Sequence, residues 1–415
     1  MKKLKQAGGN WVSGDRFWNR ENDVELFMKQ IEEGAHLLLV AQRRMGKTSL
    51  MQEAARRLGG RFTCLFVDVQ KAASPSDAIV ELSKAIYPHK KVWKKAVSVF
   101  GNVAQELADR IEKVNIGQIG VKLRAGLTEG NWVAKGDELL AILADVTPAV
   151  VLLLDEVPVL VNRMLKNDEF TITAERRRAV DRFMSWVRDN TIRHRGKLRI
   201  VVSGSIGFEP VLRQAGLSAT LNTFQPFELK PWDDATAVGC IEALAAEYGV
   251  IFDEGIPAEM VRRLGCNVPH HVQMFFTHVW DACKRANRMT VTSEDAAKVY
   301  GNEMLGVRGH AELTHYEERL KMVLGSETLP LALDMVTEAA VTGCLGRAAI
   351  ADLRNEYAFE GRKTAEVQEE ILRVLEHDGY LEGADDGYVF VSRLLRDWWR
   401  KRYGNLFIPV AQRKA

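Results

Sequence analysis

The sequence is poor in cysteine and has no long apolar run. Its five cysteines stand far apart and form no Cys-x-x-Cys pair: Cys64, Cys240, Cys266, Cys283 and Cys344. An odd and scattered set argues against a disulfide framework and against a zinc cluster, so a reducing cytoplasm is the expected compartment. No segment approaches the roughly 18 consecutive apolar residues that cross a membrane, and no apolar stretch follows the basic start of the chain. We therefore expect a cytoplasmic protein that makes no membrane contact.

The sequence also lacks an excess of charge of one sign. It has 57 Lys and Arg against 55 Asp and Glu, a net charge of +2 with neutral histidines. This balance argues against a protein that works as one large basic surface for nucleic acid. At roughly 150 residues per domain, 415 residues suggest two to three domains, each long enough to bury a core.

Four short apolar segments in the first half have the pattern of buried strands. They cover residues 36–41, 62–69, 149–154 and 198–203. Helical patterns are expected around them, near 21–33, 47–58, 76–86 and 175–189. Continuous apolar strands that alternate with helices indicate an α/β fold, in which helices cover both faces of a parallel sheet.

A long interruption, about 88–136, separates the second strand from the third. Its first part has a helical pattern. The glycine-punctuated piece that follows, residues 116–130, is expected to form one or two short strands in a hairpin. We interpret the whole interruption as a decoration of the sheet rather than a separate binding module.

The second half of the chain is mainly helical. Helices are expected near 233–248, 256–264, 270–286, 293–304, 331–341, 345–357, 365–378 and 394–403. Pro330 would stand at the start of the helix 331–341, where its missing N–H costs little. Two short strands, 380–382 and 388–392, flank an Asp-Gly turn that is typical of a hairpin. The last three helices before this hairpin, together with the hairpin itself, predict a winged-helix domain.

The strongest motif is a phosphate-binding loop at residues 41–49. It reads Ala41, Gln42, Arg43, Arg44, Met45, Gly46, Lys47, Thr48, Ser49. This fits G-x-x-x-x-G-K-[ST] except that Ala41 replaces the first glycine. Gly46 lets the backbone N–H groups turn towards a phosphate, Lys47 reaches the β- and γ-phosphates, and Thr48 offers a hydroxyl to Mg²⁺. A strand before the loop and a helix after it support nucleotide binding over a chance match.

Two carboxylates follow the apolar strand 149–154. Asp155 at the carboxyl end of this strand would hold Mg²⁺, and Glu156 would activate the attacking water. The next strand ends in Ser203-Gly204-Ser205, where a hydroxyl, that of Ser205 in particular, could sense the γ-phosphate. The alternative at Ser205 is an ordinary strand end.

These motifs, in this order, resemble those of the archaeal-type P-loop ATPases of the AAA+/STAND group. Residues 43–50 resemble the R-R-x-G-K-T-S-L of that family, and residues 17–26 resemble its F-x-G-R-E-x-E-L segment, with Asn19 where glycine is usual. Residues 265–270 resemble the G-x-P element of its helical lid, and residues 391–399 resemble the end of its winged-helix domain.

The resemblance implies ATP and Mg²⁺ as ligands and slow ATP hydrolysis. It places Arg20 near the base and Pro269 at the nucleotide. It implies an α/β ATPase domain at 1–230, a helical lid at 231–309 and the winged-helix domain at 310–415. It further implies a protein client or effector, such as one encoded by a neighbouring gene, and leaves a homo-oligomer open.

Several arginines are weaker candidates. Arg193, Arg195 and Arg199 surround the start of the strand 198–203, where ring-forming relatives have an arginine that reaches a neighbour's γ-phosphate. A solvated helix end is the favoured alternative. Arg176-Arg177-Arg178 is likewise interpreted as a solvated face.

The predicted third helix of the winged-helix domain is too acidic for a DNA-reading helix. Residues 365–378 contain five acidic side chains and one arginine. Such a face repels phosphates, because DNA affinity depends on neutralising them with Lys and Arg. Residues 310–415 carry 14 basic and 18 acidic residues, a net of −4, which leaves +6 on residues 1–309. We therefore favour a docking module over a DNA reader.

The sequence thus favours an ATP-binding and ATP-hydrolysing molecular switch. In this switch the nucleotide state controls docking of the winged-helix domain or of a partner protein. One alternative is an ATP-controlled DNA-binding initiator or transposition-type regulator, with DNA as a partner that is not favoured. Another is a scaffold that binds protein partners without hydrolysing ATP.

Overall fold

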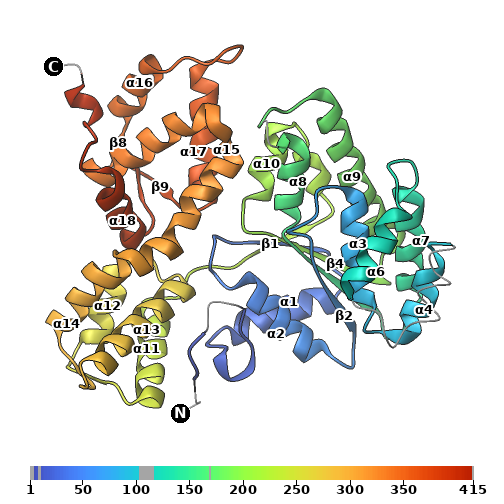
Figure 1. Ribbon diagram of the computed structural model, residues 1–415, viewed down its shortest axis with the longest axis horizontal. Helices are drawn as coiled ribbons and strands as arrows, with labels where there is room; N and C mark the ends of the chain where they lie inside the picture. Colours follow the sequence, from blue (N-terminus) through green and yellow to red (C-terminus); the bar gives the residue numbers. More distant parts are fainter. Residues whose placement is uncertain (1–3, 8–10, 102–115, 168–169, 414–415) are drawn as a thin grey trace. The chain divides into compact units, whose positions relative to one another are not determined.

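The computed structural model describes residues 4–7, 11–101, 116–167 and 170–413 (Figure 1). The chain forms two compact units. One comprises Arg20–Val40 and Lys47–Leu229, and we call it the sheet unit. The other comprises Met1–Asn19, Ala41–Gly46 and Lys230–Ala415, and we call it the helical unit. The three-domain division at residues 230 and 309 stays a prediction.

A five-stranded parallel sheet forms the centre of the sheet unit. Its strands are β1 (Leu37–Val40), β2 (Thr63–Asp68), β3 (Val150–Asp155), β4 (Leu198–Ser203) and β5 (Gln225–Glu228). Their order across the sheet is β2-β3-β4-β1-β5. The central strands are almost wholly buried because helices cover both faces, which confirms the predicted α/β class.

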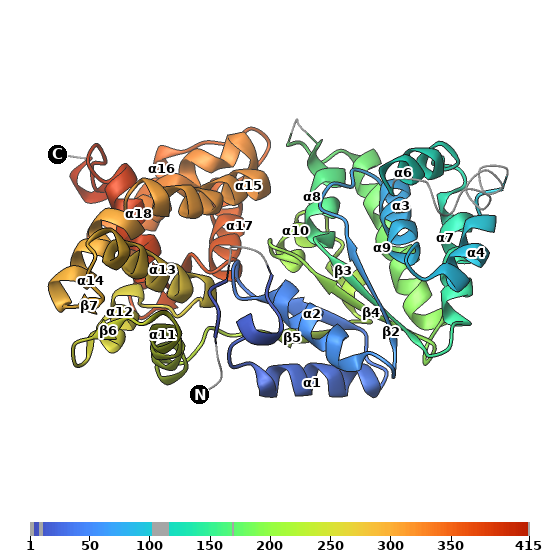
Figure 2. The same cartoon turned by 60° about the horizontal axis from the view of Figure 1, so that its bottom comes forward.

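Helices α1 (Glu21–Glu32) and α2 (Lys47–Leu58) pack together on one face of this sheet, as Figures 1 and 2 show. Side chains of α3 (Pro75–Ile86), α7 (Trp132–Ala144), α8 (Val157–Lys166) and α9 (Ala174–Arg193) pack on the other face. The other described helical segments of the sheet unit are α4 (Lys90–Ser98), α6 (Ile116–Ala125), α10 (Phe208–Gln214) and the 3₁₀ turn η3 (Ser218–Leu221).

The edge strand β5 escapes sequence analysis. Only Phe227 of its four residues is buried, and Pro226 removes a backbone donor. A proline is tolerated because β5 pairs only with β1, at the edge of the sheet. Its composition therefore resembles a loop, although its backbone continues the parallel ladder.

The hairpin predicted within 116–130 is wrong. Residues 116–125 form α6, whose Ile119 and Leu123 are buried at helical spacing. Gly120 brings this helix close to α3, because a Cβ there would lie 2.5 Å from Cε of Lys84. Gly120, one of the glycines that suggest turns, thus serves close helix packing. The helical pattern predicted for the first part of the interruption forms α4 over Lys90–Ser98, and residues 102–115 lie outside the described residues.

The helical unit begins with the 3₁₀ turn η1 (Gly14–Arg16) and continues after residue 230. Its first helices are α11 (Asp234–Tyr248), α12 (Ile256–Leu264), α13 (Pro269–Arg285) and α14 (Ser293–Val299), and a two-stranded ladder joins β6 (Ile251–Phe252) to β7 (Thr290–Val291). The helix predicted over 293–304 ends earlier, at Val299, and a π-helical turn, η4 (Tyr300–Met304), follows it. The other three predicted helices are confirmed to within two residues at each end.

A long helix begins the C-terminal part of the helical unit. Helix α15 covers Val307–Thr342 and is interrupted at Gly325, whose φ of +82° is not helical. The predicted start of a helix at Pro330 is therefore wrong, because the second half of α15 begins directly after Gly325 and Pro330 lies inside it. Glycine tolerates this left-handed φ, which explains the position of the break.

The remaining C-terminal elements follow the predicted order. They are β8 (Leu345–Gly346), α16 (Arg347–Glu356), α17 (Thr364–His377), β9 (Leu381–Ala384), β10 (Gly387–Phe390), α18 (Arg393–Tyr403) and the 3₁₀ turn η5 (Val410–Gln412). Strands β9 and β10 form the expected antiparallel hairpin, to which β8 adds a third strand. Trp398 and Trp399 are buried, and the Trp399 indole donates to the Thr337 hydroxyl. The interpretation of this part as a winged helix remains a proposal.

Candidate nucleotide site

The predicted phosphate loop connects β1 to α2. Two of its residues have a left-handed backbone, Arg44 at φ +66° and Gly46 at φ +92°. Such turns direct successive N–H groups into a concave nest that binds anions, and the positive end of the α2 dipole adds to the attraction. Lys47 opens α2 and is 8% exposed. The local geometry is therefore that of a phosphate-binding loop, although Ala41 replaces the first glycine.

The two residues predicted to hold the metal lie side by side. Thr48, in the first turn of α2, donates its hydroxyl to Oδ2 of Asp155 at the end of β3, over 2.7 Å. Burial raises the pKa of the Asp155 carboxyl, and the neighbouring charge of Glu156 raises it further. A bound hard cation would stabilise the ionised form of this buried carboxyl. The Thr48 hydroxyl and the Asp155 carboxylate are oxygen ligands of the kind that Mg²⁺ prefers. The residues thus fit a site that two protein oxygens and nucleotide phosphates would share.

Glu156 has a strained backbone. It is the N-cap of α8 at φ +64° and ψ +24°, a conformation that is uncommon for residues other than glycine and asparagine. Its Oε2 accepts two hydrogen bonds from Ser205, from the backbone N–H at 2.9 Å and from the hydroxyl at 2.8 Å. Backbone strain of this kind collects at functional sites, where the surrounding structure holds it in place.

Gly204 allows the approach of Ser205 to Glu156. A Cβ at Gly204 would lie 2.5 Å from Cδ of Pro158, in the first turn of α8. Any larger residue would separate the end of β4 from the start of α8. The Ser-Gly-Ser segment is therefore more than an ordinary strand end, because its glycine lets Ser205 reach the carboxylate.

The structure places the other predicted site residues as follows. Arg20 is the N-cap of α1 and is 9% exposed, and its Nη1 lies 3.0 Å from Oδ2 of Asp23. Pro269 is the first residue of α13 in the helical unit. Ala41, Gln42, Arg43, Arg44 and Met45 precede Gly46 in the loop, and Ser49 follows Thr48 in α2. The predicted contacts of Arg20 with the base and of Pro269 with the nucleotide stay predictions.

Two of the arginine-finger candidates make local contacts. Arg193 Nη1 lies 2.8 Å from Asp137 Oδ2. Arg199 donates to the backbone oxygens of Ile31 and Gly196, and it stands at the start of β4, the end opposite to Ser203. Arg199 thus has a local structural role rather than that of the solvated helix end we favoured, and the assignment of an arginine finger stays untested.

Sequence analysis missed an acidic residue that contacts the phosphate loop. Glu312, in the first half of α15, places its Oε2 2.6 Å from Nη2 of Arg44 and 3.3 Å from Nε2 of His270. These two partners, His270 first, lower the pKa of Glu312 to about 2. No motif marks a glutamate on a helix more than 260 positions away from Arg44, so no sequence signal was available for Glu312.

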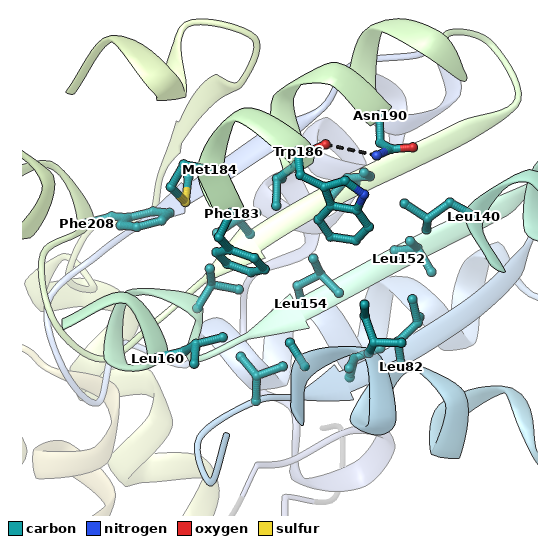
Figure 3. A pocket seen from close by; sticks show the side chains of 18 residues that line it. Leu82, Leu140, Leu152, Leu154, Leu160, Phe183, Met184, Trp186, Asn190 and Phe208 are labelled. Atoms are coloured by element: carbon teal, nitrogen blue, oxygen red, sulfur yellow. Dashed lines mark hydrogen bonds between the residues drawn. The ribbon is translucent and has the colours of Figure 1, made fainter. Parts of the chain in front are cut away.

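An apolar cavity of about 50 Å³ lies within the core of the sheet unit (Figure 3). Leu152 and Leu154 of β3 line it, opposite Phe183 and Trp186 of α9. Asn190 is its one polar lining residue, and the Asn190 amide donates to the Trp186 carbonyl oxygen. Such a lining offers nothing to a phosphate or a metal, so this cavity is not the nucleotide site.

The comparisons with known proteins identify the fold. The chain matches the solved structure of the Walker-type ATPase PABY2304 of Pyrococcus abyssi with a TM-score of 0.62 and 15% identity, over 95% of this chain and 99% of that chain. The chain therefore has the P-loop NTPase fold, with the five-stranded parallel sheet described above. At this identity the likeness establishes the fold and not the activity.

Two other solved structures are less similar. The Aeropyrum pernix ORC2 protein in complexes with ADPNP and ADP matches with a TM-score of 0.49 and 11% identity, over 92% of this chain and 93% of that chain. The Thermotoga maritima RuvB Holliday junction branch migration motor matches with a TM-score of 0.44 and 14% identity, over 91% and 94%. No protein-family model matches the sequence, and no curated protein matches it either. None of the described helices is long and apolar enough to cross a membrane.

Proposed function

We propose that this protein binds ATP with Mg²⁺ and hydrolyses it slowly, as a molecular switch of the AAA+/STAND type. The observation that carries the proposal is the pairing of Glu156 with Ser205 beside the Thr48–Asp155 pair. A strained, anchored glutamate next to an Mg²⁺-ligand pair suits hydrolysis, whereas nucleotide binding alone requires no such glutamate.

Different residues of the chain have different roles in the proposed hydrolysis. Lys47 and the loop N–H groups bind the phosphates, while Thr48 and Asp155 would hold Mg²⁺, which neutralises charge on the phosphate oxygens when bound. Glu156 orients the attacking water and accepts its proton. Ser205 fixes one carboxylate oxygen of Glu156, and no described residue donates to the other, Oε1, which is therefore able to accept from water.

Replacing Lys47 with Ala tests nucleotide binding. Loss of the ammonium group leaves the phosphate charge without its main partner, so the affinity for Mg²⁺-ATP should fall by about 100-fold or more. Titration with a fluorescent ATP analogue measures this fall. Lys29→Ala is the control, because Lys29 is an exposed residue of α1 whose ion pair is to Glu33, the C-cap residue of that helix. Equal affinity of the Lys47→Ala variant and the wild type would refute the proposed site.

A switch requires that binding or hydrolysis of the nucleotide change the C-terminal part of the helical unit. The ion pair of Arg44 with Glu312 supports this, because it connects the phosphate loop to α15. Addition of ATP should change hydrogen exchange in α15 and α17 of the wild type and leave the Lys47→Ala variant unchanged. Identical exchange with and without bound ATP in the wild type would contradict the switch. A protein client, such as one encoded by a neighbouring gene, is the partner we propose for it.

A further inference from the structure

The phosphate loop contains a backbone conformation that its sequence does not favour. Arg44 has φ +66°, in the left-handed region where glycine and asparagine are common and arginine is not. The loop needs a left-handed turn to direct its N–H groups inwards. Because arginine adopts such a turn only when its surroundings hold it there, some contact must stabilise Arg44.

Glu312 makes that contact. The Arg44 side chain is 19% exposed, and its Nη2 lies 2.6 Å from Oε2 of Glu312. A charge-assisted hydrogen bond of this length is among the stronger ones in proteins. His270, the second residue of α13, lies 3.3 Å from the same oxygen and is a second partner that holds the Glu312 carboxylate.

A second contact holds the same loop. The Gln42 side chain packs against Gly379, at the turn between α17 and β9, so closely that a Cβ at Gly379 would lie 2.0 Å from Cδ of Gln42. Gly379 has φ +75° and thus suits the turn as well. Residues 41–46 belong to the helical unit. Two of them, Gln42 and Arg44, are therefore held by residues of the C-terminal part of the same unit.

We propose that Glu312 is a positioning residue of the nucleotide site. Through Arg44 it holds the left-handed turn of the phosphate loop, so the affinity for nucleotide depends on α15. By linkage, a bound nucleotide stabilises the Arg44–Glu312 pair by the same factor. The inference rests on the proposed function, since it concerns the loop that would bind ATP.

Removing the charge of Glu312 gives the first test. The Glu312→Gln variant should bind Mg²⁺-ATP and Mg²⁺-ADP about five- to tenfold more weakly than the wild type. The ATP concentration for half-maximal turnover should rise equally, whereas kcat at saturating ATP should stay the same, because in the proposed mechanism Glu312 acts on the phosphate loop and takes no part in water activation by Glu156. The control is Glu318→Gln, the same charge change on α15, where the Glu318 carboxylate pairs with His315 of the same helix.

A glycine at position 44 separates the positioning role from a merely structural one. Glycine supports φ +66° without an anchor, so Glu312→Gln should cause no further loss of affinity in the Arg44→Gly background. The double variant should also bind ATP more tightly than Glu312→Gln alone. Circular dichroism confirms that each variant is folded, and Glu312→Asp, which keeps the charge, gives a further variant with an intermediate expected affinity.

Each outcome bears on the proposal. Unchanged or tighter ATP binding by Glu312→Gln would overturn it, as would an equal loss in the wild-type and Arg44→Gly backgrounds, because Glu312 would then not act through Arg44. If the wild type binds no nucleotide and Lys47→Ala behaves identically, the proposed function fails together with this inference. A wild type that binds ATP, with no effect of Glu312→Gln, overturns the inference alone.

Discussion

Single residues in this site have conformations and protonation equilibria that oppose stability. Glu156 and Arg44 have positive φ, and the Asp155 carboxylate is buried, which raises its pKa. Such costs persist in native proteins when they serve a function. The motif predicted which residues gather here, because Lys47, Thr48 and Asp155 belong to recognisable patterns. The ion pair of Arg44 with Glu312 and the hydrogen bonds of Glu156 with Ser205 could not be predicted to the same extent, since contacts over a long sequence separation follow from the packing of elements.

Asp155 gives a prediction on stability. An acid whose folded pKa lies above its unfolded value of 3.8 destabilises the fold once it ionises, so the penalty is absent below about pH 3.8 and complete above the raised pKa. Asp155→Asn should therefore raise the midpoint of thermal unfolding at pH 7 without nucleotide, by roughly 2–4 °C for about 1 kcal/mol. The same variant should lose Mg²⁺-dependent turnover. A lower midpoint at pH 7 would show that the carboxylate stabilises the fold.

At the scale of elements, hydrophobic periodicity predicted strands β1 to β4 and most helices. It failed for α6, whose glycines suggest turns, and for β5, which lies at the edge of the sheet. Residues 116–126 contain Gly117, Gly120 and Gly126, a spacing that suggests turns, yet the close approach of α6 to α3 makes Gly120 a packing residue. Strand β5 has a single buried side chain. Neither the packing role of Gly120 nor the pairing of β5 with β1 can be recognised from the segment's own sequence, because each depends on a neighbouring element.

Two helical glycines give a matched prediction. In α7, a Cβ at Gly136 would lie 2.6 Å from the Trp186 ring and 3.1 Å from Ile79, whereas in α11 the nearest atom to a Cβ at Gly239 is 3.4 Å away. Alanine gains about 1 kcal/mol of helix propensity at either position, but overpacking costs about 1–3 kcal/mol. Gly136→Ala should thus lower the free energy of unfolding by about 1 kcal/mol, and Gly239→Ala should raise it by about 0.5–1 kcal/mol. Urea unfolding measures both, and a stabilised Gly136→Ala variant would contradict the packing argument.

At the scale of the whole molecule, the small net charge of +2 is the sum of a basic N-terminal part and an acidic C-terminal part. Residues 310–415 carry a net of −4 and the preceding residues +6. On α17, the acidic residues Glu366, Glu369 and Glu376 are exposed, and Glu369 is paired with Arg373. The face that a DNA-reading winged helix would present to phosphate therefore carries the wrong charge.

This charge distribution predicts weak DNA binding. In a gel shift with duplex DNA, with and without ATP, we expect no complex at physiological salt. Replacing Glu366, Glu369 and Glu376 with Lys should create binding that weakens as salt rises, because phosphate contacts release counterions. An ATP-dependent, salt-sensitive complex of the wild type would instead favour the DNA-binding regulator. Solution mass with and without ATP would show in the same samples whether ATP drives assembly.

The central claim is that Glu156 makes this protein an ATPase, and release of inorganic phosphate under steady-state conditions tests it most directly. Wild type and Glu156→Gln should bind Mg²⁺-ATP with similar affinity, because Lys47 and the phosphate loop are unchanged. Turnover by Glu156→Gln should fall by about 10²–10⁴-fold, the contribution typical of a general base. Unchanged turnover in Glu156→Gln would contradict the account, and a wild type that binds ATP but releases no phosphate would identify a non-hydrolysing scaffold.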